Sequence, residues 1–117
     1  MKKKVLLIHT GGTIGMVRDR QSGVLKPDHF YESLMQVIPE LTDLAEIEVQ
    51  IPYLVDSSEI HPTYWQQLAE MIKTHIDRID GVVITHGTDT MAYTASALSY
   101  MLMNIPIPVV MTGAQKP

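Results

Sequence analysis

The chain of 117 residues has no cysteine, and this absence removes several kinds of chemistry at once. Without thiols the protein can form no disulfide, use no cysteine nucleophile and build no cysteine-based metal site. The five histidines do not replace them, because none is paired at His-x-x-x-His spacing with an acidic partner. The sequence therefore indicates neither a metal ion nor another cofactor.

The chain also lacks an excess of positive charge and a long hydrophobic run. Its 9 Lys and Arg residues against 13 Asp and Glu give a net charge of -4, whereas nucleic-acid-binding domains concentrate basic residues on one face. No apolar stretch approaches the roughly 20 residues of a membrane span, and the run Val5–Ile8 is too short for a signal peptide. We expect a cytoplasmic globular domain with one core, which binds neither nucleic acid nor membranes.

Short apolar runs alternate with segments of helical periodicity. Runs rich in Val, Ile and Leu predict strands at residues 5–10, 46–51, 81–85 and 107–112. The spacing of apolar residues between these runs predicts three helices. They are expected from Asp28, as the N-cap, to Ile38; from His61-Pro62 onward, with Trp65, Leu68, Ala69, Ile72 and Ile76 as the buried stripe; and from Thr90 to Met103.

The order β-α-β-α-β-α-β predicts an α/β fold of three layers, in which helices cover both faces of a mainly parallel sheet. Strict alternation in residues 46–51 places that strand near the sheet edge, and we expect the strand at 107–112 to be buried. In such sheets ligands bind at the carboxyl ends of the strands. That rule selects the places after Thr10, Val55, Thr85 and Thr112.

The first of these places carries the run Thr10-Gly11-Gly12-Thr13-Ile14-Gly15. Its glycines let the backbone turn sharply and approach a ligand, and Thr13 adds a hydroxyl at the strand end. A phosphate-binding turn fits poorly, because neither G-x-G-x-x-G nor G-x-x-x-x-G-K-[ST] is present. A purely structural turn explains the run as well as a catalytic one does.

The third place carries Thr85-His86-Gly87-Thr88-Asp89-Thr90 at the start of a helix. Thr88, Asp89 and Thr90 are all favoured caps, and one of them is expected to act as one, but a single cap leaves the rest of the run unexplained. A hydroxyl and a carboxylate near Thr13 suggest nucleophilic catalysis with an orienting acid. For His86 we favour burial with backbone partners over a role as general base.

The second place carries Asp56-Ser57-Ser58. Hydroxyls at a strand end can bind a ligand carboxylate, although such a stretch is more often an ordinary turn or cap. Taken alone, this run does not decide between the two interpretations.

Together, Thr10–Ile14 and His86–Thr90, which follows about seventy residues later, resemble the two signature motifs of the bacterial-type L-asparaginase family. The likeness covers the whole chain, including Asp56–Ser58 and Val110–Ala114, and Gly12–Met16 is most similar to the cytoplasmic type I members. The resemblance implies a Rossmann/flavodoxin-like amino-terminal asparaginase domain. In residues 1–117 we expect that domain to be truncated, without the family's carboxy-terminal domain.

The resemblance also implies an activity for the full-length protein, namely hydrolysis of L-asparagine to L-aspartate and ammonia. Thr13 matches the nucleophile, which forms a β-aspartyl ester with the substrate, and Thr88 and Asp89 match the second catalytic threonine and the acid beside it. Ser57 matches the residue that holds the substrate's α-carboxylate, and Asp89 matches the one that contacts its α-ammonium group. The substrate-binding set implied in this way comprises Asp56, Ser57, Ser58, Thr88, Asp89 and the backbone carbonyl of Ala114.

Three departures from the family pattern limit what residues 1–117 are expected to do alone. The family's triad lysine lies beyond residue 117, and Lys116 is not in its sequence context. The second domain, which completes the site from a neighbouring subunit, is missing. Where many members have a tyrosine, the chain reads Ser22–Leu25. We expect the isolated segment to be inactive and the full-length protein to form a homodimer or homotetramer.

Two other functions are compatible with the same motifs. The segment could be an amino-acid-binding or assembly module, inactive alone, within a larger polypeptide. The parent could also be the asparaginase-like subunit of a tRNA-dependent amidotransferase, which passes ammonia to a second subunit. That subunit usually carries an extra domain before the first signature, and here only a few residues precede the first strand, which disfavours it.

Overall fold

The computed structural model describes residues 2–11 and 26–114. Four strands are present in this part of the chain: β1 (Lys3–His9), β2 (Ala45–Gln50), β3 (Gly81–Thr85) and β4 (Val109–Thr112). The helices are α1 (Pro27–Val37), α2 (Leu41–Leu44), α3 (Pro62–His75) and α4 (Met91–Met101), with a short 3₁₀ turn η1 (Ser57–Glu59). No helix within these described ranges is long and apolar enough to cross a membrane.

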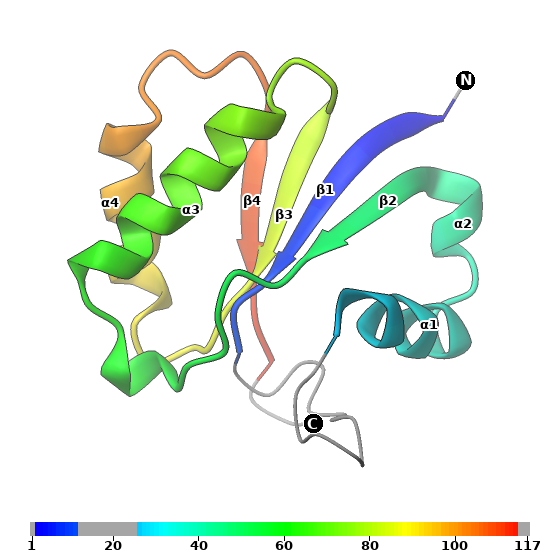
Figure 1. Ribbon diagram of the computed structural model, residues 1–117, viewed down its shortest axis with the longest axis horizontal. Coiled ribbons are helices and arrows are strands. Elements are labelled where there is room, and N and C mark those ends of the chain that lie inside the picture. Colours follow the sequence, from blue (N-terminus) through cyan, green and yellow to red (C-terminus); the bar gives the residue numbers. More distant parts are fainter. Residues whose placement is uncertain (1, 12–25, 115–117) are drawn as a thin grey trace.

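The strands form one parallel sheet in the order β2-β1-β3-β4 (Figure 1). After β1 the chain forms β2 on one side of β1, and then β3 on the other side of β1. This is the flavodoxin-like order, and its switch point lies between β1 and β3. The edge position predicted for β2 is confirmed. β4, which we expected to be buried, is the last strand of the described sheet on the other side, and Val110 is 54% exposed within this 117-residue segment.

Side chains of β1 point alternately to the two faces and hold the three layers together. Leu6 and Ile8 lie in a cluster with residues of α3 and α4, whereas Leu7 packs with Phe30 of α1 and Val49 of β2. Complete burial of such a side chain contributes about 1.5–3 kcal/mol. Figure 1 shows α3 and α4 on one side of the sheet and α1 on the other. The predicted three-layer α/β arrangement is therefore confirmed.

The start of α1 differs from the prediction because a proline sets it. α1 begins at Pro27 with Lys26 as its N-cap, so the prediction of Asp28 as the cap is wrong. Proline is favoured at the first helical position, because it has no N–H to leave unpaired, and Asp28 then lies in the first turn, near the positive end of the helix dipole. The short helix α2 was not predicted. The buried stripe of α3 is confirmed at Leu68, Ala69 and Ile72, and Trp65 and Ile76 are half-buried.

Candidate functional site

The segments that follow the strands are tied together by backbone hydrogen bonds at one edge of the sheet. The N–H of Thr10 donates to Thr85 O (3.1 Å), and the N–H of Val55 donates to Thr10 O (3.0 Å). On the other side of β3, the N–H of His86 donates to Thr112 O (3.0 Å). The four places selected from the sequence therefore lie along the carboxyl edge of the sheet, which includes the switch point.

Gly11 makes the contact between the first two of these segments sterically feasible. Its φ is +122°, and a Cβ built there would lie 2.4 Å from the carbonyl oxygen of Val55. A side chain would therefore be both strained and in collision with the backbone. The sequence suggested close approach of a ligand to the glycines, but at Gly11 the approaching group is the chain itself. Gly12 and the predicted nucleophile Thr13 lie outside the described residues.

Ser57 connects η1 to the loop between β3 and α4. Its buried Oγ accepts the N–H of Asp89 (3.1 Å), and its carbonyl accepts the hydroxyl of Thr90 (2.7 Å). A Cβ at Gly87 would lie 2.6 Å from Ser57 Cβ, so the two loops touch closely. Thr90 occupies the N-cap position of α4 but makes no side-chain cap bond. The prediction that one of Thr88, Asp89 and Thr90 caps this helix is therefore confirmed for the position, but the Thr90 hydroxyl is used across the loops and makes no cap bond.

The other predicted site residues lie around this contact. Thr88 and Asp89 are exposed on the loop, and Thr88 Cγ2 is 3.2 Å from the position of a Cβ on Gly113, the residue before Ala114. Asp56 is also exposed, and its carboxylate accepts the N–H (3.0 Å) and the hydroxyl (2.9 Å) of Ser58. These hydrogen bonds lower the pKa of Asp56. The structure thus brings all the predicted residues outside 12–25 to one edge, with Asp56 also acting as the cap of η1.

His86 is buried and has a partner for each ring nitrogen. Its Nδ1 is 2.7 Å from Gly87 O and its Nε2 is 3.0 Å from Thr94 Oγ1, which also accepts the indole N–H of Trp65 (2.8 Å). The prediction of a buried, hydrogen-bonded histidine is confirmed, although only one partner belongs to the backbone. The roles of Thr94 and Trp65 were missed. The role of Thr94 could have been suspected from the sequence, because it is the one threonine on the apolar face of α4 that also carries Leu98.

His9 is a second buried histidine at this edge, and it was not among the predicted site residues. Its ring stacks on Phe30 with centroids 4.4 Å apart, and its Nδ1 lies 2.6 Å from the hydroxyl of Thr85. Burial lowers its pKa to about 4. The imidazole is therefore neutral at physiological pH, so His9 adds an uncharged polar group beneath the site.

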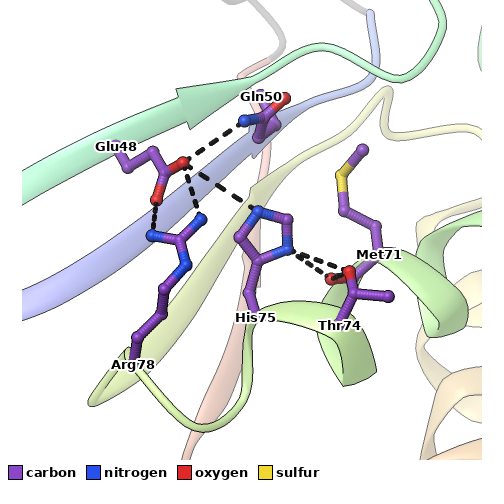
Figure 2. Close-up of polar contacts among 6 residues, drawn as sticks. All are labelled: Glu48, Gln50, Met71, Thr74, His75 and Arg78. Carbon is purple, nitrogen blue, oxygen red and sulfur yellow. Dashed lines mark hydrogen bonds and ion pairs between the residues drawn. The ribbon is translucent and has the colours of Figure 1, made fainter.

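A separate polar group of side chains joins β2 to the end of α3 (Figure 2). Arg78 donates from Nη1 (2.6 Å) and Nη2 (3.0 Å) to the two carboxylate oxygens of Glu48, and His75 Nε2 lies 3.9 Å from the same carboxylate. The hydrogen bonds from Arg78 are the main cause of a lowered pKa for Glu48. Because the side chains of Glu48 and Arg78 are 36% and 55% exposed, this is a surface ion pair.

No cluster of three or more His, Asp and Glu side chains suited to a metal ion occurs within residues 2–11 and 26–114. The chemical groups gathered at the strand ends are hydroxyls, carboxylates and backbone amides. Such a set suits recognition of a small polar molecule and, with an activated hydroxyl, acyl transfer.

A parallel α/β sheet with hydroxyl and carboxylate groups at its switch point is typical of domains that bind small molecules, on a fold that supports many chemistries. Residues 4–117 match the family model described as Asparaginase, N-terminal. The chain belongs to this family.

Individual relatives agree with this assignment. L-asparaginase 1 of Escherichia coli (strain K12) is 48% identical over 120 residues, which cover 99% of this chain and 35% of the relative. A glutamyl-tRNA(Gln) amidotransferase subunit of Methanobrevibacter smithii is 43% identical over 116 residues, covering 98% and 26%. The crystal structure of L-asparaginase I from Vibrio cholerae superposes with a TM-score of 0.82 at 41% identity, covering 100% and 35%. The chain thus spans about a third of the length of these asparaginases.

Proposed function

We propose that the full-length protein hydrolyses L-asparagine to L-aspartate and ammonia. The observation that carries the proposal is the contact between Ser57 and Asp89, which joins two loops at the switch point of the sheet. Their hydroxyl and carboxylate are suited to the two charged groups of an α-amino acid. The 48% identity to a relative named L-asparaginase 1 supports the same conclusion.

In the proposed reaction Thr13 is the nucleophile. A hydroxyl attacks an amide only when a neighbouring group accepts its proton. We expect this group to be one of the proposed catalytic residues, Thr88 or Asp89, or a residue beyond position 117. The oxygen of Thr13 bonds to the side-chain carbonyl carbon of asparagine, and the C–N bond breaks as the nitrogen leaves, protonated, as ammonia. Water then hydrolyses the resulting β-aspartyl ester to give aspartate and regenerate the threonine hydroxyl.

The described residues supply groups suited to binding and to charge stabilisation. The hydroxyl of Ser57 is proposed to meet the α-carboxylate of the substrate, and the carboxylate of Asp89 its α-ammonium group, with Asp56, Ser58 and the carbonyl of Ala114 around them. The oxyanion formed at the carbonyl requires N–H donors, which the loop before α4 can offer. Loss of one such donor typically costs about 2.7–4 kcal/mol of transition-state stabilisation.

The location and assembly of the whole protein are part of the same proposal. We expect a cytoplasmic enzyme without a cofactor, which binds neither nucleic acid nor membranes and forms a homodimer or homotetramer. Because the family's lysine and second domain lie beyond residue 117, the 117-residue segment alone is expected to be inactive or nearly so.

Ammonia release from asparagine and glutamine tests the proposal. The full-length protein, its Thr13→Ala variant and the isolated 117-residue segment are compared at saturating substrate. We expect turnover of asparagine by the full-length protein and a loss of kcat on the order of 10⁴-fold or more in Thr13→Ala. Unchanged turnover in that variant would refute the nucleophile, and full turnover by the segment would refute the need for the missing lysine.

One observation supports a second candidate, the tRNA-dependent amidotransferase. The chain is 43% identical over 116 residues to a relative named as a subunit of glutamyl-tRNA(Gln) amidotransferase. In that case the amide hydrolysis would serve to deliver ammonia to a partner subunit. Ammonia release that rises strongly only when a partner subunit and charged tRNA are added would favour this candidate over a free-standing asparaginase.

A further inference from the structure

Three buried or half-buried side chains from different elements form a line of hydrogen bonds that ends on the loop after β3. The indole N–H of Trp65 in α3 donates to Thr94 Oγ1 in α4 (2.8 Å), and Thr94 Oγ1 lies 3.0 Å from His86 Nε2. At the other side of the ring, His86 Nδ1 lies 2.7 Å from the carbonyl oxygen of Gly87. Thr94 is fully buried and His86 is 2% exposed, so water has little access to the hydrogen bond between them.

The chemistry of the partners assigns the direction of each bond. A carbonyl only accepts, so Nδ1 of His86 must carry the hydrogen that is donated to Gly87 O. In a neutral ring Nε2 is then the acceptor, and it takes the hydroxyl hydrogen of Thr94. An indole N–H only donates, so Thr94 Oγ1 accepts from Trp65 while it donates to His86. Every polar atom in the line is satisfied in one arrangement.

This arrangement orients a peptide group of the proposed active-site loop. The carbonyl of Gly87 and the N–H of Thr88 belong to one trans peptide unit, because no cis peptide occurs among the described residues. In a trans unit the two bonds point in opposite directions. Since the buried His86 holds the carbonyl on its side, the N–H of Thr88 is directed away from the core. On the following residue, Ser57 Oγ fixes the N–H of Asp89.

We propose that Trp65, Thr94 and His86 act together as positioning residues, which set the direction of the Gly87–Thr88 peptide for the reaction. The inference rests on the proposed asparagine hydrolysis, and none of the three side chains is required to touch the substrate. A backbone N–H whose direction is set in advance stabilises charge that develops in the transition state. If the direction is lost, kcat falls more than KM rises, because the interaction is stronger in the transition state than in the ground state.

The test compares two substitutions at Thr94 in the full-length protein. Thr94→Val keeps the shape of the side chain but removes the hydroxyl, whereas Thr94→Ser keeps the hydroxyl. Thr74→Val is the matched control, since the Thr74 hydroxyl donates to Met71 O within α3, on an exposed surface. Steady-state kcat and KM for asparagine are measured well below the Tm of each variant.

We expect kcat of Thr94→Val to fall by about tenfold or more, since misplacement by about 1 Å can cost roughly 100-fold, with a smaller change in KM. Thr94→Ser is expected to recover kcat to within about threefold of the unsubstituted enzyme, and Thr74→Val to leave it unchanged. A Thr94→Val enzyme with unchanged kcat overturns the positioning role. Equal losses in Thr94→Val and Thr94→Ser also overturn it, because the hydroxyl would then not be the cause.

A second measurement needs no variant and no substrate. Nitrogen-15 NMR of the imidazole rings reports which ring nitrogen of His86 carries the hydrogen. We expect the Nδ1–H tautomer, and an Nε2–H tautomer overturns the inference even if Thr94→Val does not fold. Absence of ammonia release by the unsubstituted enzyme would instead refute the proposed function, an outcome that the tautomer measurement keeps separate.

Discussion

Two polar regions of the molecule differ in burial and in charge. The strand-end network (Ser57, Trp65, His86, Asp89, Thr90 and Thr94) is built from hydroxyl, imidazole, indole and backbone groups, and Thr94 and His86 are nearly inaccessible. The Glu48 cluster (Glu48, Gln50, His75 and Arg78) is ionic and lies at the surface. Loss of one partner of a buried hydrogen bond costs about 1–3 kcal/mol, whereas an exposed ion pair contributes about 0.2–1 kcal/mol.

The positions of the two regions on the sheet explain the difference. The strand-end network lies at the switch point, where loops from different strands meet and where geometry must be held for a ligand. The Glu48 cluster lies on the edge strand β2, where charged side chains discourage pairing with another chain. We infer that the geometry of the hydrogen bonds matters for function in the strand-end network. In the Glu48 cluster the presence of charged side chains is sufficient to discourage pairing with another chain.

The largest effect on stability is expected from Gly11→Ala, which breaks the packing at the strand ends. At φ +122° a side chain strains the backbone, and its Cβ would lie 2.4 Å from Val55 O, which overpacks the site. Each effect lowers the free energy of unfolding by about 1–3 kcal/mol, so the total loss is about 2–6 kcal/mol. Gly81→Ala is the matched control, since its Cβ would lie 3.5 Å from Pro108 Cγ, an ordinary contact. Chemical denaturation measures both, and similar losses in the two variants would contradict the account.

The second effect is a dependence of stability on pH that comes from His9. Its pKa is lowered from 6.5 to about 4, so the folded state stays neutral where the unfolded chain takes up a proton. Its contribution is therefore complete above pH 6.5 and is lost as the pH falls towards 4. The loss is about 1.4 kcal/mol per pH unit and about 3 kcal/mol altogether.

Substitution of His9 by phenylalanine isolates this effect. His9→Phe keeps an aromatic ring against Phe30 but cannot titrate, so we expect the free energy of unfolding to fall less steeply between pH 6.5 and 4. His29→Gln, at an exposed position of α1, serves as the control substitution. An identical slope in His9→Phe and the unsubstituted protein would show that His9 is not the group responsible.

The smallest effect is expected in the Glu48 cluster. Removing the ion pair by Arg78→Ala should lower the free energy of unfolding only slightly, and less at high salt, because solvent screens the exposed guanidinium. Because the folded pKa of Glu48 lies below its ordinary value of 4.5, the contribution is present above pH 4.5 and is lost as the pH falls through the folded value. A cost of several kcal/mol at neutral pH would erase the contrast with the strand-end network.

The fold could be predicted because the hydrophobic pattern is local. The apolar runs at Leu6–Ile8 and Val82–Ile84 and the α3 stripe required no knowledge of partners, and they lie in the core. The cap at Asp28 was wrong because the preceding proline, Pro27, already occupies the first helical position of α1. The apolar run of β4 likewise does not reveal whether a neighbouring strand lies beside it, and in the described segment β4 is the last strand of the sheet.

The site could be predicted only in part for a related reason. Ser57, Thr88 and Asp89 follow strands, and the rule for parallel sheets was sufficient to bring them to one edge. The bond from Asp89 N–H to Ser57 Oγ spans 32 residues, and the line from Trp65 to His86 joins two helices and a loop. Such partners depend on tertiary packing, which a pattern within one element does not contain. The role of Thr13 stays a prediction from its motif.

The central claim is that Thr13 forms an ester with the substrate. Rapid quenching of the full-length enzyme with asparagine, followed by digestion and mass spectrometry, tests it most directly. We predict a β-aspartyl adduct on the peptide that contains Thr13, absent in Thr13→Ala, which also releases no ammonia. An adduct on Thr88, or normal turnover by Thr13→Ala, would contradict the account.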